Sequence, residues 1–130
     1  MLFGKGSSEI FFSDTELASL CVEGLKKGNF NGKKILVIIP DTTRSGPIKL
    51  IFRAICGALQ PQAGKVDFII ALGTHQEMSE EKVNSHLGLT DTERSGKFRN
   101  VGIFQHRWSH SDELSQIGVI TASRMAEISA

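Results

Sequence analysis

The segment KILVIIPDTTR, residues 34–44, joins an almost unbroken aliphatic run to a polar cluster that follows it directly. Runs of this kind suit a strand that is buried on both faces, as parallel strands are. The segment FIIALGTH, residues 68–75, repeats the pattern. Between the two, apolar residues at helical spacing predict a helix that begins near Pro47, a residue favoured in a first helical turn. Residues 34–72 are therefore predicted to form one β-α-β unit with parallel strands.

Further elements are predicted on both sides of this unit. A helix begins at Ser13, which has capping-box spacing with Glu16. The remaining assignments are a helix from Ser79 to a cap at Gly88, a loop over 89–99, a strand over 101–104 and a short helix over 112–117. Residues 9–12 are either an edge strand or irregular.

These elements predict an α/β fold with a mainly parallel, Rossmann-like sheet and helices on both faces. The last residues, 125–128, show no convincing helix stop. We therefore expect residues 1–130 to be one incomplete α/β domain, a fragment of a longer architecture.

Composition excludes several classes of protein. The chain has 130 residues, 40% of them hydrophobic, and a formal net charge of +1, so it is long enough for one core and has no basic surface typical of nucleic-acid binding. No apolar stretch approaches the roughly 20 residues of a membrane span, and no signal peptide is visible. Cys21 and Cys56 lack C-x-x-C spacing and are predicted to be reduced core residues. These features predict a cytoplasmic protein.

The candidate site lies where the predicted strands end. In open α/β sheets, ligands bind at the carboxyl ends of the strands, so residues that follow different strands converge there. An arginine at that edge binds carboxylate or phosphate through paired charge-assisted hydrogen bonds, and a histidine exchanges protons near neutral pH. We expect Arg44 and His75 to lie side by side. The predicted site residues are His75, Asp41, Thr43, Arg44, Gly73 and Thr74, with His106 as a further candidate.

Structural interpretations of the same residues stay open. Asp41 and Thr43 also suit a turn or a helix cap. Arg44 also suits an exposed surface position, and a single histidine after a strand is often structural. His106 and His110 have i,i+4 spacing, but the intervening Trp108-Ser109 pair does not favour a helix, so no metal site is predicted.

Several motifs together resemble the N-terminal domain of nickel-dependent lactate racemase and its relatives. The first is D-x-T-R-x-x-P at residues 41–47, and the second is A-L-G-T-H at residues 71–75. M-S-E-E at residues 78–81 and the block from Gln105 to Gly118 also fit. The resemblance covers about residues 33–128, and it rests on the two longer motifs occurring together, each after a strand.

The resemblance implies an isomerase that racemises or epimerises a 2-hydroxy acid. Enzymes of that family use a nickel-pincer nucleotide tethered to a lysine, with hydride transfer to the cofactor and a histidine base on the hydroxyl. Carried over to this chain, His75 is a general acid/base, and Arg44 binds an anionic group of substrate or cofactor. Asp41 and Thr43 then organise the loop that carries Arg44.

The sequence departs from the family pattern in three respects. Gln76 stands where the family usually has arginine, and Arg107 stands where it commonly has aspartate. The chain also lacks the family's P-H-x-x-x-G-x-S-G-G-x-K block, which carries the second histidine and the tethering lysine, and the nickel-binding histidine beyond it. We therefore expect the fragment alone to be inactive. The alternative function is a non-enzymatic module that binds small anions or nucleotide phosphates, and self-association through an exposed sheet edge is also expected.

Overall fold

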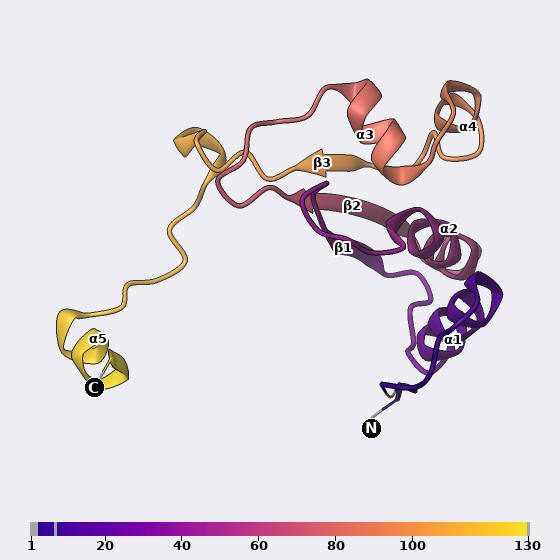
Figure 1. Ribbon diagram of the computed structural model, residues 1–130. Helices are drawn as coiled ribbons and strands as arrows, with labels where there is room; N and C mark the ends of the chain where they lie inside the picture. Colours follow the sequence, from indigo (N-terminus) through magenta and orange to yellow (C-terminus); the bar gives the residue numbers. More distant parts are fainter. Residues whose placement is uncertain (1–2, 7, 130) are drawn as a thin grey trace.

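The computed structural model describes residues 3–6 and 8–129, and it places helices beside a small sheet (Figure 1). In chain order the elements are α1 (Asp14–Lys26), β1 (Lys34–Pro40), α2 (Ile48–Leu59), β2 (Lys65–Ala71), α3 (Glu80–Leu87), α4 (Asp91–Ser95), β3 (Ile103–Gln105), a 3-10 turn (Ser111–Glu113) and α5 (Ala122–Ser129). The predicted β-α-β unit is confirmed as β1-α2-β2.

The three strands form one parallel sheet in the order β1-β2-β3. Lys34 of β1 pairs with Lys65 of β2, and the register continues without a break to the ends of both strands. The carboxyl ends of neighbouring strands therefore lie side by side, as the sequence predicted. This alignment brings the loops after β1 and β2 to the same edge of the sheet.

Local capping explains where the helices begin. Ser13 and Glu16 form the predicted capping box at the start of α1, and the Ser79 hydroxyl accepts from Lys82 N at the start of α3. Such caps pair backbone N–H groups that have no partner within the helix. Gly88 ends α3 in the left-handed conformation, with φ at 66°, as expected for a glycine cap.

The core lies on one face of the sheet. Alternate strand side chains face it, and Phe52 of α2 lies among the rings of Phe68 and Phe98, with centroids at 4.7 and 5.2 Å. Buried side chains of α2 and α3 belong to the same cluster, and part of α1 packs against it. The helices that contact the sheet therefore form a single layer over this face.

Two expectations about the opposite face of the sheet are wrong. Ile38, Ile69 and Phe104 occupy one register row across the three strands, and Ile38 and Phe104 are 71% and 51% exposed. Helices on both faces were expected, but in the part of the chain that the structure describes they cover one face. The aliphatic run of β1 was therefore wrongly interpreted as buried on both faces, because hydrophobicity does not reveal whether another element covers a strand.

Other differences are local. The segment 89–99 was predicted to be a loop but contains α4, which begins at the Thr90–Glu93 capping box. Residues 10–12 have no regular structure, and the helix expected over 112–117 is only the 3-10 turn. Within residues 3–6 and 8–129, no helix is long and apolar enough to cross a membrane. Both cysteines are free thiols; Cys56 lies in the core as predicted, whereas Cys21 is half-buried and packs against it.

Candidate functional site at the strand ends

Asp41 is the centre of the loop that follows β1. The residue is only 5% exposed, and one carboxylate oxygen, Oδ1, accepts from Thr43 N at 3.1 Å and from Thr43 Oγ1 at 2.6 Å. An aspartate that bonds to the backbone two residues later stabilises a tight turn. The backbone bond from Arg44 N to Asp41 O, at 3.4 Å, closes the same turn.

The second oxygen of Asp41 contacts the histidine that follows β2. Oδ2 lies 2.5 Å from Nδ1 of His75, although the two residues are 34 positions apart in the sequence. The Thr43 hydroxyl and then the His75 ring stabilise the ionised carboxyl, and they lower the pKa of Asp41 from 3.8 to about 2, although burial acts in the opposite direction. Asp41 is therefore ionised at neutral pH.

This contact determines which nitrogen of His75 is available for chemistry. An ionised carboxylate only accepts hydrogen bonds, so Nδ1 of His75 carries the hydrogen that it donates to Asp41. In the neutral ring, Nε2 then has the free lone pair. The His75 side chain is 56% exposed, so this nitrogen is accessible to a solute. The pair has the arrangement of a histidine base oriented by a carboxylate.

The turn before His75 depends on Gly73. Gly73 has φ at 61°, and His75 N donates to Leu72 O at 2.9 Å across the turn. Only glycine adopts this backbone region without steric cost. An added Cβ would meet nothing within 4 Å, so the requirement comes from the backbone alone. Gly73 thus sets the direction in which the chain presents His75.

Arg44 follows Asp41 and Thr43 in the loop after β1. It lines a hollow of 490 Å³ together with Thr42, Lys49 and His86, next to the start of α2. Asp14 also lines this hollow. Among residues 3–6 and 8–129, no hydrogen bond or ion pair joins Arg44 to His75; the two residues are linked only through Asp41. Within the described residues the guanidinium and the imidazole thus make no direct contact, and their side-by-side placement stays a prediction.

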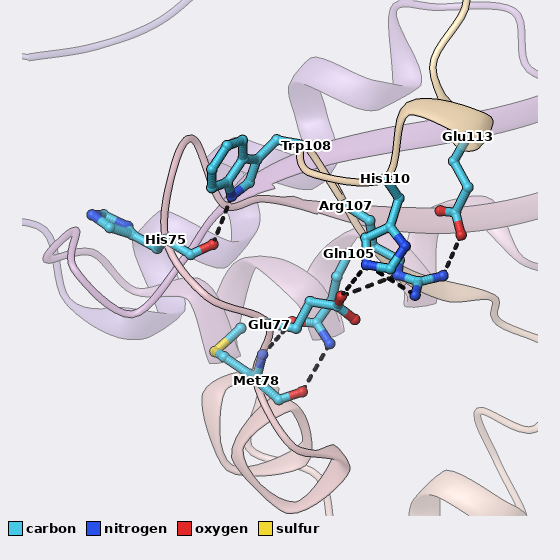
Figure 2. Close-up of polar contacts among 8 residues, drawn as sticks. All are labelled: His75, Glu77, Met78, Gln105, Arg107, Trp108, His110 and Glu113. Atoms are coloured by element: carbon cyan, nitrogen blue, oxygen red, sulfur yellow. Dashed lines mark hydrogen bonds and ion pairs between the residues drawn. The ribbon is translucent and has the colours of Figure 1, made fainter.

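The last residue of β3 and the loop after it hold the His75 loop in place (Figure 2). The Gln105 side chain accepts from Met78 N at 2.8 Å and donates to Met78 O at 2.9 Å. Trp108 Nε1 donates to His75 O at 3.2 Å. Gln105 and Trp108, which are distant in sequence from this loop, thus fix its backbone on both sides of Gln76. Gln105 also belongs to the block that carried the family resemblance, but its contact with Met78 could not be read from the sequence.

Arg107 completes this network. Its guanidinium donates to Glu77 at 3.1 Å and also binds Glu113, and Nε2 of His110 lies 3.4 Å from the same Glu77 oxygen (Figure 2). Arg107 is one of the positions at which the sequence departs from the family pattern. Here its charge is paired with two carboxylates, so it stabilises the loops rather than offering a free cation.

In the described part of the chain, two other predicted site residues make no side-chain contact that supports a role. Thr74 is exposed in the turn before His75. His106 continues the sheet pairing, because its backbone N donates to Ile70 O at 2.9 Å. Within the described part of the chain, no group of three or more His, Cys, Asp or Glu side chains is arranged to hold a metal ion. The roles of the predicted site residues stay predictions.

Comparison with known proteins decides the family. The sequence-family model of the lactate racemase N-terminal domain matches residues 17–129, which is nearly the whole chain. The chain belongs to the lactate racemase N-terminal domain family. Both sequence motifs and all of the predicted site residues of this lactate racemase N-terminal domain lie within the matched range. A comparison with curated proteins finds no match.

A solved structure shows the same fold. The crystal structure of a protein from Thermotoga maritima is similar over 89% of this lactate racemase N-terminal domain, with a TM-score of 0.71 and 22% sequence identity. The aligned part is 26% of that longer chain. At this identity the comparison supports the α/β architecture, and it carries no information on substrate.

Proposed function

We propose that this chain forms one wall of the active site of a lactate-racemase-like isomerase, and that it binds a 2-hydroxy acid next to His75. The observation that carries the proposal is the contact between Asp41 and His75. A buried, ionised carboxylate at 2.5 Å keeps the hydrogen on Nδ1 and leaves Nε2 as the proton acceptor.

In this proposal each residue has a defined task. Nε2 of His75 takes the proton of the substrate hydroxyl and returns it after the stereocentre has changed. Asp41 stabilises the imidazolium that forms in between, since the opposite charge lies in direct contact. Arg44 binds the substrate carboxylate, for which guanidinium geometry is well suited. Cytoplasmic location is part of the proposal and agrees with the two free thiols.

The residues that the structure describes do not provide a binding site for the nickel-pincer nucleotide of the family. Its tethering lysine and its nickel-binding histidine occur in motifs that this sequence lacks, and the described residues include no metal-binding cluster. We therefore assign only substrate binding and proton transfer to this chain. We also propose that the chain alone does not racemise lactate, because the group that activates the carbon–hydrogen bond has no place to be held here.

The hollow beside α2 favours a second candidate function. Arg44 and Lys49 lie in it together with Thr42, next to the positive end of a 12-residue helix. Such a site suits phosphate or a carboxylate without any need for His75. A small-anion binding module is therefore the alternative to the enzyme.

Titration with D-lactate, L-lactate and inorganic phosphate, followed by NMR of the histidine side chains, separates the two functions. The enzyme proposal predicts that lactate shifts the His75 signals, and that Arg44→Ala and His75→Gln each weaken lactate binding. Arg99→Ala is the matched control, because Arg99 is exposed and lies outside both loops. Binding of phosphate alone, lost in Arg44→Ala and unchanged in His75→Gln, refutes the enzyme proposal and supports the module.

A further inference from the structure

Within residues 3–6 and 8–129, no helix or strand covers one apolar surface of the sheet. We call it the open face; it consists of Leu36, Ile38, Ile69 and Phe104 on the side of the sheet away from the helices. Three of these four side chains are more than half exposed. Contiguous apolar surface of this kind marks a contact site, because exposing it to water is unfavourable.

A second unpaired apolar surface lies at the end of the chain. We call residues 114–129 the C-terminal arm; each of them is exposed. Figure 1 shows the arm leaving the sheet and ending in α5, which stands apart from the other helices. Its large apolar residues, all exposed, are Leu114, Ile117, Val119, Ile120, Met125 and Ile128.

We propose that the C-terminal arm of one copy of this chain covers the open face of a second copy, and that the exchange is reciprocal. The direction of the arm supports this arrangement. Leu114 has extended backbone, with φ at −105° and ψ at 138°, and Figure 1 shows the chain leading away from the sheet beyond it. The eight residues 114–121 span about 26 Å when extended, which is enough to reach a neighbouring molecule.

The size of the contact also fits. The C-terminal arm and the open face together bring 20 residues of each copy into the interface. Stable interfaces of standard size use about 20–30 residues on each side. Two-fold exchange makes the same contact twice, so both open faces and both arms are covered in one closed dimer.

The experiment measures the oligomeric state of the full chain by analytical ultracentrifugation across the micromolar range. The expected result is a dimer for the wild type. Ile38→Asp on the open face and the double variant Met125→Asp/Ile128→Asp on the C-terminal arm should each be monomeric. Phe11→Asp is the matched control and should stay dimeric, because Phe11 is 92% exposed and lies outside both surfaces.

Mixing the two monomeric variants gives the decisive measurement. The open-face variant keeps an intact arm, and the arm variant keeps an intact open face, so the mixture should recover a dimer held by one of the two contacts. Simple face-to-face association predicts no such recovery and would overturn the proposal. A wild type that stays monomeric throughout, or an arm variant that stays dimeric, would also overturn it. Misfolding would not explain an arm variant that stays dimeric, because α5 contributes no described residue to the buried core.

Discussion

Replacing Gly73 with alanine tests whether the backbone of the candidate site is built as described. Gly73 has φ at 61°, a conformation that costs an alanine about 1–2 kcal/mol. Alanine also restricts the unfolded chain, which returns about 0.4–1 kcal/mol. Apart from its chain neighbours, no described atom lies within 4 Å of the added Cβ, so no tertiary clash adds to this backbone cost. The expected net loss of unfolding free energy is about 1 kcal/mol.

Gly57 provides the matched control for the same substitution. It lies in α2 with open space around its Cβ position, and its φ is not in the left-handed region. Alanine in a helix is favoured over glycine by about 0.5–1 kcal/mol. Gly57→Ala should therefore stabilise the protein, whereas Gly73→Ala destabilises it. Gly73→Asn should lose less than Gly73→Ala, because asparagine tolerates the left-handed region better.

Urea denaturation followed by circular dichroism measures all three variants. With a slope of about 2 kcal/mol/M, a change of 1 kcal/mol moves the midpoint by about 0.5 M. The midpoint should fall for Gly73→Ala and rise for Gly57→Ala. A Gly73→Ala midpoint equal to or above that of the wild type would refute the described turn. Equal effects at the two positions would refute the backbone explanation.

Four further outcomes follow from the structure. Phe52→Ala should lower the free energy of unfolding by about 3–5 kcal/mol in urea titrations, because its ring is buried between two others, while Phe11→Ala should change it by less than about 0.5 kcal/mol. The pKa of Asp41 is about 2 in the folded protein, below its usual 3.8. The contribution of Asp41 to stability is therefore complete above about pH 4 and disappears as the pH falls through 2. Asp41→Asn should remove this part of the pH dependence of unfolding. Gln105→Leu should cost about 1–3 kcal/mol by the same urea assay, since two hydrogen bonds to Met78 are lost. Cys56 is buried and its pKa is raised to about 11, so iodoacetamide should modify it only after urea is added, as mass spectrometry would show.

The sequence alone determined the parts of the fold that depend on local chemistry. Capping pairs such as Ser13 with Glu16 specify where helices begin, because a side chain satisfies backbone donors a few residues away. The aliphatic runs of β1 and β2, separated by one helix, predicted parallel strands whose polar ends meet at one edge. The short α4 was missed, although Thr90 and Glu93 carry the same capping signal.

Tertiary structure decided which groups touch at that edge. Sequence reasoning placed Arg44 and His75 at this edge, but it did not show that His75 contacts Asp41 or that Arg44 lines a hollow with Lys49 next to α2. The reason is geometric: two loops at one sheet edge approach each other, but the turn at Asp41 and the left-handed Gly73 set the direction of each side chain. Periodicity carries no information on these directions.

The open face likewise separates what the sequence predicted from what only the tertiary structure decided. The residues of β1 are apolar on both sides, and from the sequence this predicts burial on both sides. Only the arrangement in space shows that α2 and α3 cover one side and that Ile38 and Phe104 remain exposed on the other. Hydrophobicity in a sequence records which residues favour burial. The element that buries them is determined by how the chain, or a second copy of it, is placed in space.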